Sequence, residues 1–354
     1  MKELIAKLRK KPLALAGIVA GVLVIAAIVI GFLVFGGEKT VSGEGAMDGN
    51  TNDEVPGGYL LSRKIDGVHI ARTRENFQPV AVMVENLVAS RPQAGLDTAS
   101  LVYEALAEGG ITRFMAVYAS GDQISKIGPV RSARDYYLDW VKELNAVYAH
   151  IGGSPQAFQL IPQYDILDLN QFYNSQYFWR DDKRFAPHNL YTSSELLDRA
   201  VRDKDFPEQG DFESWVYASE EDPVGESGQT LTIDFSTYSY ETSYVYDRET
   251  NEYQRFQAGE PHIMENGAEI HAKNVIVQFV KVRIADAENR LNQETIGEGE
   301  ARVYTNGREI TGTWKKETLE SRTRYFDSSN NEIELNPGKT WVAVVPTDRG
   351  VTYE

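Results

Sequence analysis

The chain has 354 residues, a formal net charge of −16 at pH 7 and no cysteine. The absence of cysteine excludes a disulfide framework and a thiolate metal site. The excess of carboxylates is unfavourable for general nucleic-acid binding, because affinity for nucleic acid depends on Lys and Arg side chains that neutralise phosphates.

The N-terminal part of the sequence predicts a membrane anchor. Residues 12–35 carry no charged side chain, and about 20 apolar helical residues cross a hydrocarbon core of roughly 30 Å. This stretch is longer than the apolar region of a cleavable signal peptide, which is usually about 7–15 residues. We therefore expect an uncleaved transmembrane helix. Residues 1–11 contain five basic side chains, so the positive-inside bias predicts a cytoplasmic tail there.

The rest of the chain is expected on the outer side of the cytoplasmic membrane. The tail, with Glu3, has a net charge of +4, which leaves −20 for the exported part. An exported chain without disulfides is typical of a bacterium with a single membrane. Any anion that this part binds must be held by a local cluster of basic groups against the overall field.

Two low-complexity stretches predict the domain boundaries. Residues 36–58 are rich in glycine and carboxylates and predict a flexible linker. The remaining length, near 300 residues, is more than one ordinary core needs and suggests two domains. The acidic stretch 218–229 is a second expected linker. It would divide a domain at 59–217 from a domain at 230–354, each separately stable.

The first of these regions mixes predicted strands and helices. The apolar runs at 79–84, 111–118 and 146–150 have the length of strands. The stretch 98–108 fits either a strand or a helix. The glycine pair that follows it, Gly109-Gly110, suits either a helix stop or a hairpin turn.

Helix starts in this region are marked by serine. Ser132 is the expected N-cap of a helix at 132–145, with Asp135 at the capping-box position. Ser154 is followed by Pro155, a pair that is typical of an N-cap and a first helical residue. A third helix is expected after residue 192.

From about residue 230 the pattern changes to short β-rich runs separated by turn signals such as Asn306-Gly307. The runs lie at 230–235, 242–247, 252–256, 274–280, 301–305 and 341–346. This spacing predicts an antiparallel sandwich or roll. The expected fold class is thus an α+β ectodomain, a mixed sheet with helices, followed by an antiparallel all-β domain, behind one transmembrane helix.

One concentration of anion-binding groups remains after the Walker, H-E-x-x-H and dinucleotide motifs are excluded. The five histidines show no metal-ligand spacing, and no metal site is expected. Helix starts offer free N–H groups, and glycines let an anion approach the backbone. The expected ligand-binding residues are Arg113, Arg131, Ser132, Arg134, His150, Gly152, Gly153, Ser154, His188 and Asn189. The alternative is that the arginines pair with carboxylates and that Ser154 only caps a helix.

The stretches EGGITRFMAVY, IGPVRSARDYY and HIGGSPQA, together with GTWKKE and PGKTWVAVVP, resemble the YerB-like family of bacterial lipoproteins. The resemblance covers roughly residues 59–346. It implies an N-terminal domain and a C-terminal β domain, and it supplies no reaction. Many members carry a lipid on a cysteine. Because this chain has none, its transmembrane helix must serve as the anchor.

The order of TRFMAVY, GPVRSAR and NAVYAHIGGSPQA is also similar to the core of LytR-CpsA-Psr phosphotransferases. That resemblance implies pyrophosphate contacts at Arg113 and Arg131. Met115 and Ser132 stand where those enzymes have aspartates, one of them used for Mg²⁺, so a Mg²⁺ cofactor is not supported.

We therefore interpret the chain as an envelope protein that binds a phosphate-bearing wall or polyprenyl-linked ligand. If it is an enzyme, a phosphotransferase or hydrolase, Asp135 and Glu104 are the candidate catalytic groups. The alternative is a non-catalytic scaffold whose β domain binds an envelope protein.

Overall fold

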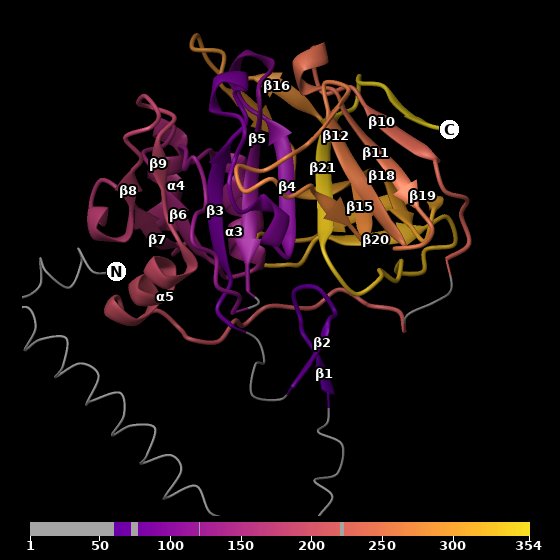
Figure 1. Ribbon diagram of the computed structural model, residues 1–354, viewed down its shortest axis with the longest axis horizontal. Helices are drawn as coiled ribbons and strands as arrows, with labels where there is room; N and C mark the ends of the chain where they lie inside the picture. The colour runs from indigo at the N-terminus through magenta and orange to yellow at the C-terminus, as the bar shows by residue number, and fades with distance from the viewer. Residues whose placement is uncertain (1–59, 72–76, 120, 220–222) are drawn as a thin grey trace, which may run out of the picture. The chain divides into compact units, whose positions relative to one another are not determined.

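The computed structural model describes residues 60–71, 77–119, 121–219 and 223–354 (Figure 1). The expected cytoplasmic tail, transmembrane helix and first linker lie outside these residues. Among the described residues, no helix is long and apolar enough to cross a membrane.

The described residues of the first region form strands and three α-helices. The helices are α3 (Asp135–Glu143), α4 (Pro155–Gln163) and α5 (Ser194–Asp203). The strands are β1 (Leu60–Ser62), β2 (His69–Ala71), β3 (Val80–Glu85), β4 (Leu101–Leu106), β5 (Thr112–Tyr118), β6 (Val147–His150), β7 (Leu167–Asn170), β8 (Trp179–Arg180) and β9 (Leu190–Tyr191). The ambiguous stretch after residue 98 is therefore a strand, and it forms an antiparallel pair with β5.

The second region contains strands, with no α-helix among its described residues. They are β10 (Thr230–Ile233), β11 (Thr242–Asp247), β12 (Glu252–Gln257), β13 (Glu260–Pro261), β14 (His271–Ala272), β15 (Asn274–Val280), β16 (Val282–Ile284), β17 (Leu291–Gln293), β18 (Gly297–Thr305), β19 (Arg308–Lys316), β20 (Arg324–Asp327), β21 (Thr340–Pro346) and β22 (Val351–Tyr353). Each β-rich run expected from the sequence overlaps one of these strands.

A ten-stranded sheet crosses the expected domain boundary. Its order is β20-β19-β18-β15-β21-β4-β5-β3-β6-β7. Strand β21 is parallel to β15 and also parallel to β4, with Trp341 opposite both Val275 and Val102. The second region is thus not purely antiparallel. The stretch 218–229 separates two segments of sequence but does not separate two sheets.

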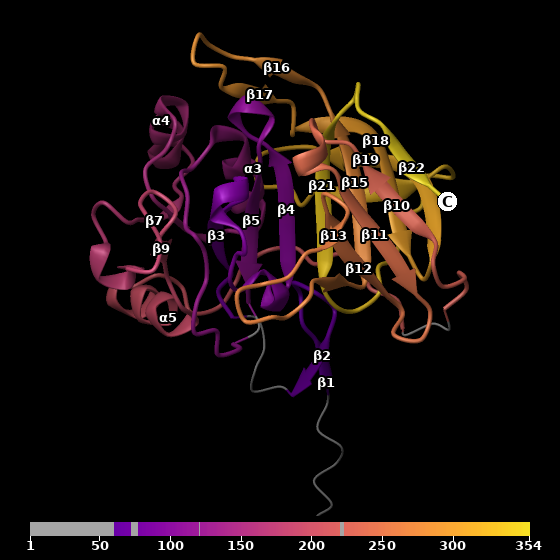
Figure 2. The same ribbon diagram turned by 45° about the horizontal axis from the view of Figure 1, so that its top comes forward.

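Apolar side chains fill both faces of this sheet. On one face, α3 and α4 bury Trp140 and Ile161 against Met83 of β3. On the other face, α5 contributes Leu197. A smaller sheet of order β13-β12-β11-β10-β22 packs on that second face through Tyr244 and Tyr253 (Figures 1 and 2). The small sheet therefore shares its core with strands of both regions.

The predicted cap of α4 and the predicted start of α5 were correct. The Ser154 hydroxyl accepts a hydrogen bond from the Ala157 N–H at 3.1 Å, and Pro155 is the first residue of α4. Ser193 caps α5 in the same way. The expected cap at Ser132 was wrong. Helix α3 begins at Asp135 after Arg134, without a side-chain cap, because residues 131–134 are extended along the segment at 151–154.

Candidate functional site

The large sheet has a topological switch point between β3 and β6. These strands are adjacent and parallel, with Val80 opposite Val147. After β3, the chain passes Leu96 on the α5 face and continues to β4 on one side. After β6, it passes through α4 on the opposite face to β7 on the other side. In open α/β sheets, ligands bind outside the carboxyl ends of strands at such a point.

Two segments converge at this edge of the sheet. The Ala133 N–H donates to the Gly152 carbonyl at 3.0 Å, and the Ile151 N–H donates to the Arg131 carbonyl at 3.1 Å. Ser154 N–H donates to the Ala133 carbonyl at 3.1 Å. The starts of α3 and α4 therefore lie side by side at the carboxyl end of β6. The structure brings together the two helix starts that the sequence marked.

The expected N–H donors of the glycine turn are already occupied. Gly152 has a φ of +64°, which suits glycine, and its N–H donates to the Asn170 Oδ1 atom at 3.2 Å. The Ser154 N–H bonds Ala133, and its hydroxyl caps α4. The expectation that the turn from Gly152 through Gly153 to Ser154 offers free donors was therefore wrong at Gly152 and Ser154. The segment at 131–133 and Asn170 bind these groups instead.

Three arginines surround the switch point. Arg113 lies near the start of β5 and donates from Nη1 to the Ser132 carbonyl at 3.0 Å. Arg131 pairs with Glu85 at the end of β3. Arg134 pairs with Glu108, with 2.7 Å between Nη2 and Oε2. The alternative reading from the sequence, that Arg131 and Arg134 pair with carboxylates, is thus what the structure shows.

The cluster is electrostatically uneven. Arg113 is 6% exposed, and its Nε atom is buried without a hydrogen-bond partner. Burial and the neighbouring Arg134 lower the pKa of Arg113. Burial raises the pKa of Glu85, but the charges of Arg113 and Arg131 outweigh it and hold that pKa below its ordinary value. Three guanidinium groups therefore face two carboxylates, and one guanidinium N–H is unsatisfied.

Two histidines lie at the same edge. His150 is fully buried between the Gly152 carbonyl, 2.7 Å from Nδ1, and the Asp168 carboxylate, 2.8 Å from Nε2. The ring nitrogens of His150 thus both lie within hydrogen-bond distance of oxygen atoms. His188 lies 3.8 Å from Glu85 through Nδ1. Burial and the nearby Arg131 lower the pKa of His188.

The remaining predicted residues are Asn189, Asp135 and Glu104, and each lies in a different setting. Asn189 accepts from Arg180 at 2.7 Å and donates to the carbonyls of Asp181 and Arg184, so it holds the loop that carries His188. Asp135 starts α3, and burial raises its pKa. Glu104 lies in the interior with both carboxylate oxygens occupied. Among the described residues, no group of three or more His, Asp or Glu side chains is arranged to hold a metal ion.

The carboxylates Glu85 and Glu108 and the exposed Phe185 were not among the residues expected from the sequence. Glu85 is the last residue of the otherwise apolar strand β3. A carboxylate at the carboxyl end of such a strand is the sequence signal that could have identified it as a site residue. Phe172 lies over Gly152 and is 64% exposed, and Phe185, in the turn before His188, is 93% exposed. An exposed aromatic side chain, Phe172, therefore lies beside the glycine turn, and Phe185 is exposed on the loop that carries His188.

Comparison with known proteins supports this description of the chain. Residues 67–207 match the N-terminal domain of a family described as "Protein of unknown function (DUF3048)", and residues 231–342 match its C-terminal domain. The chain is 28% identical over 291 residues to "Putative lipoprotein YerB" of Bacillus subtilis, covering 81% of this chain and 86% of that protein. The chain belongs to the YerB-like DUF3048 family.

The crystal structure of YerB from Bacillus subtilis has the same fold. The TM-score is 0.74 at 27% sequence identity, over 82% of this chain and 99% of the other. The two DUF3048 matches, at residues 67–207 and 231–342, fall one in each of the two regions described above, and β21 lies beside β4. The YerB-like resemblance inferred from the sequence motifs is confirmed.

Proposed function

We propose that this YerB-like protein binds a phosphate-bearing ligand at the switch point between β3 and β6. The observation that carries the proposal is the convergence of Arg113, Arg131 and Arg134 at that point. Arg113 is buried there with an unpaired Nε atom, although the whole chain carries a net charge of −16. Maintaining a buried unpaired N–H group costs free energy, and an anion that accepts from it recovers that cost.

Binding would proceed by exchange of partners. Glu85 and Glu108 hold Arg131 and Arg134 in the free protein. A phosphate presents more acceptor oxygens than a carboxylate, and arginine binds both through the same planar fork. Arg131 is 21% exposed and Arg134 is 13% exposed, so solvent reaches both. The phosphate would take N–H groups that the carboxylates occupy, and it would add the free Nε of Arg113.

Two exposed phenylalanines extend the proposal to a ligand with an apolar or flat part. Phe172 and Phe185 lie on loops that also hold the residues around Gly152 and His188. Burying one such side chain contributes roughly 1.5–3 kcal/mol. A phosphate carried on a wall polymer or a lipid offers an anionic group and an apolar or flat part, whereas free phosphate offers only the anionic group.

We infer that the protein acts outside the cytoplasmic membrane. The relative in Bacillus subtilis is named a lipoprotein, and the name implies a membrane anchor outside the cytoplasm for that protein. The present sequence contains no cysteine to carry a lipid. The apolar stretch 12–35, outside the described residues, would anchor this chain instead.

One observation favours a second function, that of a non-catalytic scaffold. Arg131 and Arg134 already have carboxylate partners, as expected if they only stabilise loops. In that case the exposed Phe185 and Phe172 would contact an envelope protein. The two functions differ in whether the arginines bind a small anion.

Thermal melts of the full-length protein with and without pyrophosphate separate them. A ligand that binds only the folded state raises its stability by mass action. Arg131→Ala should weaken binding about ten- to a hundredfold, since a hydrogen bond to a charged group contributes about 1.5–3 kcal/mol. Arg248→Ala is the control, because Arg248 is 46% exposed and pairs with Glu226. Absence of any shift in the wild type at millimolar pyrophosphate would favour the scaffold.

A further inference from the structure

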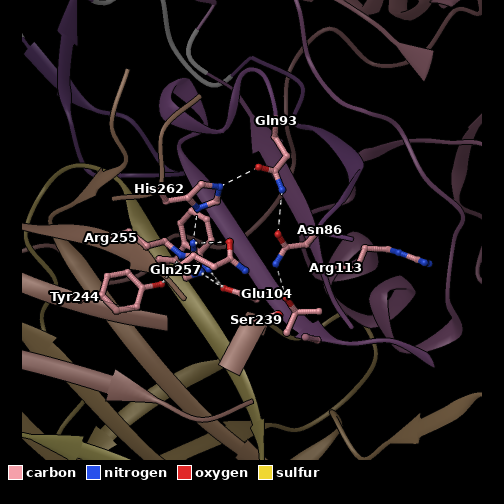
Figure 3. Close-up of polar contacts among 12 residues, drawn as sticks. Asn86, Gln93, Glu104, Arg113, Ser239, Tyr244, Arg255, Gln257 and His262 are labelled. Atoms are coloured by element: carbon pink, nitrogen blue, oxygen red, sulfur yellow. Dashed lines mark hydrogen bonds and ion pairs between the residues drawn. The ribbon is translucent and has the colours of Figure 1, made fainter. Parts of the chain in front are cut away.

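A ring of buried polar side chains links residues near the ends of β3 and β4 with Arg255 and His262 of the smaller sheet's region (Figure 3). Arg255 donates to Glu104 at 2.8 Å, Thr112 donates to Glu104 at 2.8 Å, and Asn86 donates to the Thr112 hydroxyl at 2.6 Å. Gln93 donates to Asn86 Oδ1 at 3.0 Å. His262 closes the ring, because Nε2 lies 2.9 Å from Gln93 Oε1 and Nδ1 contacts Arg255 Nη1.

Two ring members, Arg255, which only donates, and Glu104, which only accepts, fix every donor and acceptor in the ring. Guanidinium only donates, so His262 Nδ1 must accept from Arg255, and His262 Nε2 then donates to Gln93. The Gln93 amide donates to Asn86, and the Asn86 amide donates to the Thr112 hydroxyl. The Thr112 hydroxyl then donates to the Glu104 carboxylate, which only accepts hydrogen bonds. Each member thus has one consistent role. Burial and the charges of Arg255 and Arg91 lower the pKa of His262 well below its ordinary range, which keeps Nδ1 free to accept.

The ring is attached to the arginine cluster through the backbone of β3 and β5. The Gln93 amide also donates to the Glu85 carbonyl at 3.0 Å. Asn86 and Thr112 are the sequence neighbours of Glu85 and Arg113, and those two residues lie opposite each other in the sheet. The ring therefore fixes the strand ends from which Glu85 and Arg113 project.

The two DUF3048 domains contribute unequally to the ring. Arg255 lies on β12, His262 follows β13, and both belong to the C-terminal domain, whereas the other members belong to the N-terminal domain. Arg255 is fully buried, and its guanidinium lies 4.6 Å from the ring centre of Trp341. The C-terminal domain thus holds the end of β3 from the interior side.

We propose that Arg255 and His262 are positioning residues for the anion site, through which the C-terminal domain sets the geometry of Glu85, Arg113 and Arg131. This inference rests on the proposed phosphate site for its function and on the ring for its structure. It assigns the C-terminal domain an indirect role in binding, through the orientation of the strand ends that carry Glu85 and Arg113.

Variants of His262 provide the test, in the full-length protein. His262→Leu removes both hydrogen bonds, and His262→Gln can keep an acceptor for Arg255 and a donor for Gln93. Gln93→Met cuts the same link from the other domain and serves if His262→Leu fails to fold. The matched control is Lys316→Met, since Lys316 is fully buried, joins the same two domains by a 3.0 Å pair with Glu143, and is not a member of the ring.

Two measurements are made on each variant. The first is pyrophosphate affinity, which His262→Leu should weaken about tenfold, a typical effect of a residue that orients a ligand-binding group. His262→Gln should restore it to within about threefold, and Lys316→Met should leave it unchanged. The second measurement is the NMR position of the Arg113 and Arg131 Nε–H signals, which should move in His262→Leu and remain in place in Lys316→Met.

The second measurement separates the two proposals. If the wild type does not bind pyrophosphate, the phosphate site fails, and the arginine signals alone decide whether the ring positions the cluster. If His262→Leu and Gln93→Met leave those signals and the affinity unchanged, the positioning role is overturned. A loss that Lys316→Met reproduces in both measurements would also overturn it, because the effect would then be general destabilisation.

Discussion

The ring and the arginine cluster both contain arginine, glutamate and histidine side chains. They differ in whether the hydrogen bonds among these side chains form a closed circuit. In the ring, Arg255 and Glu104 are fully buried, and the donors and acceptors close on one another. In the cluster, Arg131 is 21% exposed, and the Nε atom of Arg113 has no partner. A closed set of hydrogen bonds leaves no group for a ligand, whereas an open set gains from one. Closure of the hydrogen bonds, more than residue type, thus distinguishes the buried network from the cluster that we propose as a binding site.

Separating the two regions of the chain should reduce the stability of the fold most, because it divides the ring. We expect residues 1–217 alone to lack a stable fold, since β4 loses β21 as its neighbour and Glu104 loses Arg255. A chain cleaved at an engineered protease site within 218–229 should remain one particle. Size-exclusion chromatography of the cleaved protein measures this. Two separately folded fragments would restore the two-domain expectation from the sequence.

Substituting a single ring residue should give the second-largest loss of stability. Arg255→Met leaves Glu104 buried without its cation, and removing one partner of a buried pair costs about 3–5 kcal/mol. Arg248→Met, at an exposed pair, should change the free energy of unfolding by less than about 1 kcal/mol. Urea denaturation of both variants gives the two values. A similar small loss in both would mean that the ring adds no more than a surface pair.

Asp139 is a buried carboxylate that belongs neither to the ring nor to the arginine cluster. Its substitution should change the free energy of unfolding less than breaking the ring does. Burial raises the pKa of Asp139 to about 6, although it accepts from Thr295. The folded state thus binds a proton that the unfolded state releases between about pH 4 and 6, so the stability from this group is lost as pH rises through 6. Asp139→Asn should therefore raise the free energy of unfolding at pH 7, by at most about 3 kcal/mol for a shift of about two pKa units.

The same variant should give little difference at pH 4, where Asp139 of the folded wild type is protonated. Denaturation curves at the two pH values test this. Equal stabilisation at pH 4 and pH 7 would show that the gain does not come from the carboxylate.

Local elements of the fold were predictable because their signals are local. Ser154 and Pro155 mark the start of α4, and the run at 274–280 is β15. The partners of β21 were not predictable from turn spacing, because strand pairing depends on contacts far apart in sequence. One signal was available. Residues 341–346 form an apolar run without alternation, which is typical of a parallel strand buried on both faces.

The candidate site was predictable in part. The starts of α3 and α4 share one edge of the sheet because β6 lies between them in the chain. The partners of Arg131 and Arg134 could not be read from the sequence, since Glu85 and Glu108 lie 46 and 26 positions away. The ring was also beyond prediction, because Arg255 and His262 come from the other domain and only the shared core brings them to Glu104.

Calorimetric titration of pyrophosphate into Glu85→Gln and Arg131→Ala is the most direct test of the proposal that the arginine cluster is an open site. Both substitutions break the Arg131–Glu85 pair, so both should lower stability. Their effects on binding should be opposite. Glu85→Gln removes the competing carboxylate charge and should tighten binding, whereas Arg131→Ala removes a ligand-binding cation and should weaken it about ten- to a hundredfold. If the two variants bind pyrophosphate equally, or neither they nor the wild type bind it, the cluster is not a phosphate site.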